Sequence, residues 1–148
     1  MRHSLQVVAE AAAAITPALN SRKTPATTLL TKDYTARNSE TLTGKLRQNV
    51  KISIADGAAV TLKNASINGV NDELYEWAGI TCEGDAVLIL EGSNDVKGFY
   101  EEYPGIHVSE NKTLTIKGEG SLTAASNGYG AGIGGGWDIS CGNIVLTA

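Results

Sequence analysis

The 148-residue chain is poor in the residues on which many small binding sites and small folds depend. Its two cysteines are too few for a disulfide framework, and too few for a structural zinc site without nearby histidines. Aromatic residues make up only 5% of the chain, so aliphatic and small side chains must fill its interior. No arginine follows Arg47 and the net charge is −4, which argues against nucleic acid and anionic membrane surfaces as partners. No apolar run approaches the roughly 18 residues that span a bilayer, so we expect no membrane span.

Glycine, by contrast, is abundant, and six of the 17 glycines lie in YGAGIGGGWDISCGN, from Tyr129 to Asn143. Gly130, Gly132 and Gly135 match the letters of the dinucleotide fingerprint G-x-G-x-x-G. That reading fails because the run of glycines disfavours a following helix and no acidic residue stands about 20 positions further on. We expect these glycines to turn the chain at the corners of a repeating backbone, since glycine adopts positive φ without steric cost.

An internal repeat is the main signal in the sequence. One aliphatic position recurs at intervals of 28, 26 and 27 residues, at Ile52, Ile80, Ile106 and Ile133. It lies in short alternating runs bounded by Gly, Asn, Asp or Ser, a pattern typical of strands and not of helices. Stacked repeats of this length indicate a solenoid. The sequence therefore predicts an all-β fold, a right-handed, single-stranded parallel β-helix of about four coils with three short strands in each.

Further columns set the predicted register. The second strands align Val60, Leu88, Leu114 and Ile144, with Leu62, Leu90, Ile116 and Leu146 two residues on, and the third strands align Leu42, Ile67, Val96 and Leu122. On the outside, one column holds Lys63, Glu91 and Lys117, and a turn column holds Gly57, Asp85 and Asn111. Opposite charges on rungs about 4.8 Å apart would stabilise the stack. The same register puts Cys82 and Cys141 two rungs apart, so we expect two unlinked, buried or half-buried thiols.

The two ends lie outside the regular repeat. Residues 1–38 are predicted to form a helical or irregular cap or a leader, and residues 39–148 the β-helix. The stretch VVAEAAAAI predicts a short helix ending near Pro17. It faintly resembles a signal peptide, although Glu10 interrupts it, so this segment is a native leader, a cap or a cloning scar. CGNIVLTA stops after a second strand, so we expect the β-helix to be truncated in its last coil. Because this edge has no charge and no proline, it is a candidate for self-association.

Four stretches carry a resemblance to a known family: DYTARNSETLTGKLRQNVKISIADGAAVTLKNASINGV, WAGITCEGDAVLILEG, YPGIHVSENKTLTIKGEGSLTA and GYGAGIGGGWDISCGNI. Together they cover roughly residues 33–148. They resemble bacterial surface proteins, common in gut anaerobes, that are described as carbohydrate-binding-domain-containing. The resemblance implies an extracellular or cell-surface β-helix that binds a polysaccharide or glycan, in some members with calcium. No export signal is evident in the chain.

The loops from third strand to first strand are the candidate binding site, because NDELYEW and FYEEY combine aromatic with acidic residues. Trp77 and Tyr103 occupy one column, so aromatics stacked at rung spacing would offer a flat platform to apolar sugar faces. The predicted glycan-binding residues are Tyr75, Trp77, Tyr100, Tyr103, Tyr129 and Trp137. The candidate calcium ligands are Asp72, Glu73, Glu76, Glu101 and Glu102. Alternatively, Trp77 and Tyr103 only seal the corner, and the acids solvate an exposed loop.

Three function classes follow from this pattern. The first is a non-catalytic cell-surface glycan-binding module, the second a structural spacer or stalk of a bacterial adhesin, and the third a polysaccharide lyase or hydrolase fragment. Lyases of this fold use a basic residue, often an arginine, beside calcium, and inverting hydrolases need two carboxylates about 6.5–9.5 Å apart on a rigid face. The acids here lie in loops, and His107 is expected to be a solvated outward residue without a positioned partner. We therefore expect no enzyme activity, and calcium as the one candidate cofactor.

Overall fold

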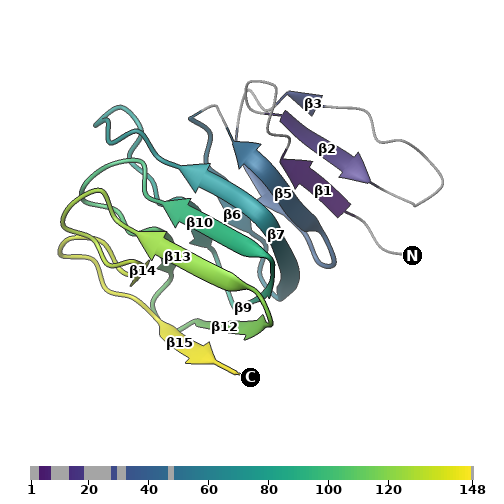
Figure 1. The fold of residues 1–148 in the computed structure, drawn as a ribbon. Coiled ribbons are helices and arrows are strands. Elements are labelled where there is room, and N and C mark those ends of the chain that lie inside the picture. Colours follow the sequence, from purple (N-terminus) through teal and green to yellow (C-terminus); the bar gives the residue numbers. More distant parts are fainter. Residues whose placement is uncertain (1–3, 8–13, 19–27, 30–32, 47–48, 148) are drawn as a thin grey trace.

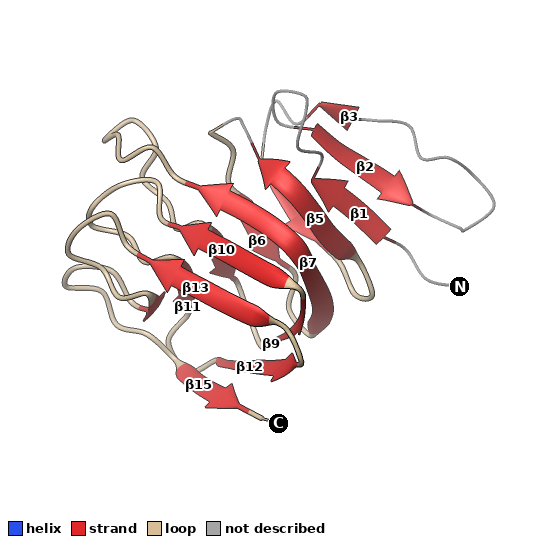
Figure 2. Cartoon of the chain, in the orientation of Figure 1, coloured by secondary structure: helices blue, strands red, loops and turns tan. Residues whose placement is uncertain are grey.

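The computed structural model describes residues 4–7, 14–18, 28–29, 33–46 and 49–147. The regular elements in these ranges are strands (Figure 2). They stack in parallel as a β-helix, so the predicted fold class is confirmed. Three complete turns are formed by β6–β7, β8–β10 and β11–β13, with shorter turns on either side, close to the about four coils predicted.

The first face of the β-helix is a parallel sheet of five short strands. In spatial order these are β4 (Tyr34–Ala36), β6 (Ile52–Ile54), β8 (Ile80–Cys82), β11 (Ile106–Val108) and β14 (Ile133–Gly134). The repeating isoleucines are direct partners from strand to strand: Ile52, Ile80, Ile106 and Ile133. The first three are fully buried, because alternation turns every second side chain of a strand into the core. The column predicted from the repeat is confirmed.

The other two faces share one larger sheet. Its strands are β5 (Thr41–Leu46), β7 (Ala58–Asn68), β9 (Ala86–Glu91), β10 (Ser93–Lys97), β12 (Thr113–Gly118), β13 (Ser121–Ala125) and β15 (Asn143–Leu146). β7 continues along both faces and pairs first with β9 and then with β10. Figure 1 shows β7, β10 and β13 side by side along the stack.

On the second face the predicted register is right between β7 and β9 but wrong by two residues at β12. Direct partners between β7 and β9 include Val60 with Leu88 and Lys63 with Glu91. At β12 the partner of Leu88 is Ile116 and not Leu114. Lys117 lies opposite Ile89, so it does not extend the column of opposite charges. A shift of two residues keeps every inward side chain inward, which is why the hydrophobic pattern did not reveal it.

A longer turn causes this shift. Five residues separate Val108 from Leu114, whereas three separate Cys82 from Ala86, the partner of Leu114. As a result, the Thr113 amide donates a 2.8 Å hydrogen bond to the Asp85 carboxylate, in the place predicted for Asn111.

The third face shows similar shifts. Ile67 and Val96 are partners, as predicted, but Leu46 lies opposite Ile67 where Leu42 was expected. Leu42 lies opposite Leu62 on the second face, before the register shift that follows Thr43 in β5. Ala124, and not Leu122, lies opposite Val96.

The described residues that precede β4 form strands, whereas a helix was predicted in this segment. β1 (Ser4–Val7), β2 (Ala14–Ala18) and β3 (Thr28–Leu29) form an antiparallel sheet. Pro17 lies inside β2, so the short helix is wrong; residues 8–13 of that stretch lie outside the described residues. β1 lies beside β5 and so covers the first coil (Figure 1). The parallel stack itself begins at β4, within the segment predicted as cap.

The two cysteines are free, as predicted. Cys82 is buried on the inward side of β8, whereas Cys141 is exposed, so the expectation of two buried or half-buried thiols is wrong for Cys141. In the part of the chain that the structure describes, no helix is long and apolar enough to cross a membrane.

Candidate functional site

The loops that join the third strand of one coil to the first strand of the next stack on one another. The Asp72 amide donates to the Phe99 carbonyl over 2.9 Å, and the Phe99 amide donates to the Trp77 carbonyl over 3.0 Å. One coil further on, the Trp137 amide donates to the Glu102 carbonyl over 2.8 Å. These backbone bonds hold the predicted aromatic and acidic residues at one corner of the β-helix.

Glycine is needed in this corner mainly because neighbouring backbone segments pass very close to it, and less because of positive φ. A Cβ on Gly105 would lie 2.7 Å from the Gly132 carbonyl oxygen and 2.8 Å from that of Val96. One rung earlier, a Cβ on Gly79 would lie 2.8 Å from the Gly105 carbonyl oxygen. Within GAGIGGG only Gly134 has positive φ, at 140°. The expected role of these glycines in positive-φ turns is therefore wrong for most of them: the stacked loops come too close for a side chain.

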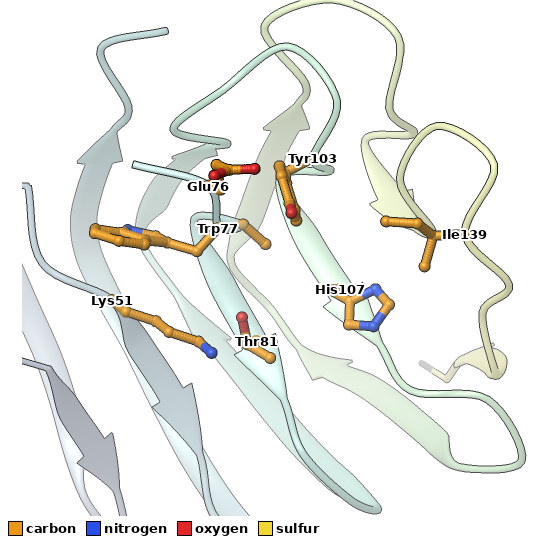
Figure 3. Close-up of a pocket in the computed structure, with 8 residues that line it drawn as sticks. Lys51, Glu76, Trp77, Thr81, Tyr103, His107 and Ile139 are labelled. Carbon is orange, nitrogen blue, oxygen red and sulfur yellow. The ribbon is translucent and has the colours of Figure 1, made fainter. Parts of the chain in front are cut away.

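Tyr75 and Trp77 pack inward. The Trp77 ring lies 5.9 Å from the ring of buried Phe99 and 5.5 Å from that of Tyr75, measured between centroids. Both residues are half-buried against the core. Figure 3 shows the rings of Trp77 and Tyr103 apart from each other and not stacked. Trp77 therefore seals the corner, and the flat platform expected of the Trp77 column does not form.

A hollow of about 130 Å³ opens on the outer side of the first face, next to this seal (Figure 3). The residues that line it are Lys51, Glu76, Trp77, Ala78, Thr81, Tyr103, His107 and Ile139. The sequence had placed Trp77, Tyr103 and Glu76 at the site but had missed Lys51, Thr81 and Ile139. The signal for Thr81 was its outward place between Ile80 and Cys82.

His107 belongs to the floor of this hollow. It lies directly opposite Thr81 on β8 and Gly134 on β14. Its Nδ1–H donates to the Gly134 carbonyl over 3.1 Å, since a carbonyl oxygen can only accept. The side chain is outward, as predicted, but half-buried and positioned rather than freely solvated.

A second hollow of about 290 Å³ lies at the coil-four end of the corner. It is lined by Glu102, Tyr129 and Trp137. Tyr129 is 67% exposed and Trp137 60% exposed, so both aromatic side chains are largely open to solvent. The Tyr129 amide donates to the Glu101 carbonyl, which fixes this loop on the acidic loop beneath it. These residues keep the exposed aromatic and acidic character that the sequence predicts for the whole corner.

Negative charge concentrates around Tyr100 and Tyr103, the other two tyrosines of the predicted site. Desolvation raises the pKa of the Tyr100 phenol, and the nearby carboxylates of Glu101, Glu102, Glu73 and Glu76 raise it further. Desolvation also raises the pKa of Tyr103, followed by the charges of Glu76 and Glu102. Both phenols stay protonated at neutral pH and can donate hydrogen bonds.

The five acids predicted as calcium ligands do not converge. Within the described ranges, no three His, Cys, Asp or Glu side chains form a group that could hold a metal ion. The Asp72 carboxylate accepts a 2.9 Å hydrogen bond from the Leu74 amide and so stabilises its own loop. The structure gives the calcium hypothesis no ligand set.

No protein family, curated protein or solved structure matches this chain.

Proposed function

We propose that this chain is a non-catalytic glycan-binding module that acts outside the cell, at the cell surface. The observation that carries the proposal is the second hollow, which the exposed side chains of Tyr129 and Trp137 line together with Glu102. Aromatic rings stack on the apolar faces of sugars, and a carboxylate accepts hydrogen bonds from sugar hydroxyls. Large exposed aromatic residues that gather at a hollow are uncommon without a binding role.

The backbone under these rings favours binding further. The Trp137 amide is bonded to the Glu102 carbonyl, and the Tyr129 amide to that of Glu101. The exposed rings therefore stand on loops anchored to the preceding rung. Loops held in this way lose less conformational entropy when a ligand binds, which raises affinity.

A glycan array tests the proposal. The wild-type chain is expected to retain at least one class of glycan. The double variant Tyr129→Ala and Trp137→Ala should bind it at least about tenfold more weakly, which corresponds to about 1.4 kcal/mol. Leu74→Ala is the matched control, because Leu74 is 75% exposed in a neighbouring loop and its loss should change binding little.

Two results would contradict the proposal. If the folded wild-type chain retains no glycan, the regular stack is better explained as a spacer or stalk. If the double variant binds as well as the wild type, the second hollow is not the site.

A further inference from the structure

The hollow on the first face offers groups unlike those of the acidic corner beside it. Lys51 is the one lysine among its described lining residues, and Thr81 and His107 come from adjacent strands of its floor. In Figure 3 the ammonium end of Lys51 extends toward Thr81, while Glu76 and Tyr103 lie together at the other side of the hollow. One side therefore carries a positive charge, and the other a carboxylate and a phenol.

The hydrogen bond of His107 fixes what that ring can offer. Because Nδ1–H is committed to the Gly134 carbonyl, Nε2 is the nitrogen left for a ligand. The neutral ring accepts a hydrogen bond at Nε2, and the protonated ring donates one. Thr81 can do either through its hydroxyl. These partners, with Lys51, suit an oxygen-rich ligand that bears an acidic group.

Because the neighbouring corner is acidic, the positive charge of Lys51 decides whether an anionic ligand can bind. Glu73, Glu76, Glu101 and Glu102 all act on the phenol of Tyr100, so the corner as a whole repels anions. An anionic ligand can settle there only where a cation offsets this field. The ammonium of Lys51 supplies that cation.

The size of the hollow limits the ligand to one unit. Its volume of about 130 Å³ lies well below the ~300–1,000 Å³ of pockets that enclose drug-sized molecules. Trp77 and Ile139 give it apolar wall area beside the polar groups. One sugar ring fits this description better than an oligosaccharide does.

We propose that this hollow binds a single acidic sugar residue of the glycan, with the sugar carboxylate at Lys51 and the sugar hydroxyls toward Glu76 and Tyr103. The proposal rests on the glycan-binding function, and it names the class of sugar that the first hollow selects.

A pair of probes that differ only in the acidic group tests it. Methyl glucuronide and methyl glucoside are titrated into the full chain, and binding is followed by the NMR shifts of backbone amides and of the His107 ring. The glucuronide is expected to bind about tenfold more tightly, the gain typical of one charge-assisted hydrogen bond. Lys51→Gln should remove this preference and leave the weaker binding of the glucoside nearly unchanged. Lys63→Gln is the matched control, since it removes the same charge from an exposed position on β7.

Each outcome decides the proposal. A lost preference in Lys51→Gln with an intact one in Lys63→Gln supports it. A preference that survives in Lys51→Gln, or that falls equally in both variants, overturns it. Equal binding of the two sugars by the wild type overturns this inference but leaves the glycan-binding function standing, whereas an empty glycan array removes both. If Lys51→Gln fails to fold, Lys51→Met gives the second measurement, because it also removes the ammonium, and the same loss of preference is expected.

Discussion

Asn94 should be among the most costly polar residues to replace. Its side chain is only 2% exposed and faces inward from β10. Its Oδ1 accepts a 2.8 Å hydrogen bond from the Ala65 amide, and its Nδ2 donates to the carbonyls of Glu91 and Ser121 over 3.2 and 3.1 Å. One side chain thus satisfies backbone groups of three successive coils at the bend between the second and third faces.

Asn94→Leu keeps the approximate volume of the side chain but leaves these three backbone groups without their partner. Each hydrogen bond contributes about 1 kcal/mol net, and a buried group left unpaired costs about 1–3 kcal/mol, so we expect a loss of about 3–5 kcal/mol in the free energy of unfolding. Urea denaturation followed by tryptophan fluorescence measures this loss, provided that the slope with urea is unchanged. In native-state hydrogen exchange, the Ala65 amide should lose protection.

Asn68→Leu serves as the matched control, because the same substitution falls on an exposed residue at the end of β7. Its effect should stay within about 0.5 kcal/mol. The reasoning is refuted if Asn94→Leu costs less than about 1 kcal/mol, or if the Ala65 amide exchanges no faster than in the wild type.

Three further predictions concern the stacked loops, the thiols and the last strand. Gly105→Ala should destabilise the chain in urea denaturation by about 1–3 kcal/mol, since the new methyl group would meet three backbone atoms within 2.8 Å; an unchanged midpoint would contradict the close approach. Burial raises the pKa of the Cys82 thiol to about 12, so at pH 8 a thiol-reactive dye should label Cys141 alone, and equal labelling of both cysteines would contradict this. Because the neutral thiol is favoured in the folded state, its stabilising contribution is complete below the unfolded value near 9 and is lost as the pH rises toward 12. We also propose that the 148-residue chain self-associates through β15, whose inward-column residues Ile144 and Leu146 are 38% and 74% exposed; sedimentation should show dimers that Val145→Lys weakens, and a monomer at high concentration would count against it.

The sequence predicted the inward columns because burial acts on every second residue of a strand. Ile52, Ile80 and Ile106 are fully buried, and no polar residue could replace them without cost. This alternation does not reveal how many residues a turn contains. The two extra residues before Leu114 preserve the alternation, so the inward side chains of β12 still point inward although their partners on β9 have changed. The N-terminal error has a similar origin, because an alanine-rich sequence favours a helix locally, whereas the described residues 15–18 pair with another strand.

The site was harder to predict because a column fixes where a Cα lies but not where its side chain points. Trp77 and Tyr103 share a column, yet the Trp77 ring turns down onto Phe99 while Tyr103 lines the open hollow. The difference follows from burial, since an aromatic ring that can reach the core gains more there than at the surface, at roughly 25 cal/mol per Å² of apolar area. Phe99 offers Trp77 that contact from the next coil. Trp137 is 60% exposed in the last loop of the corner, so its ring stays largely in contact with solvent. Whether an aromatic ring seals the corner or stays exposed is therefore decided by what the neighbouring coil provides, and the column in the sequence does not contain this information.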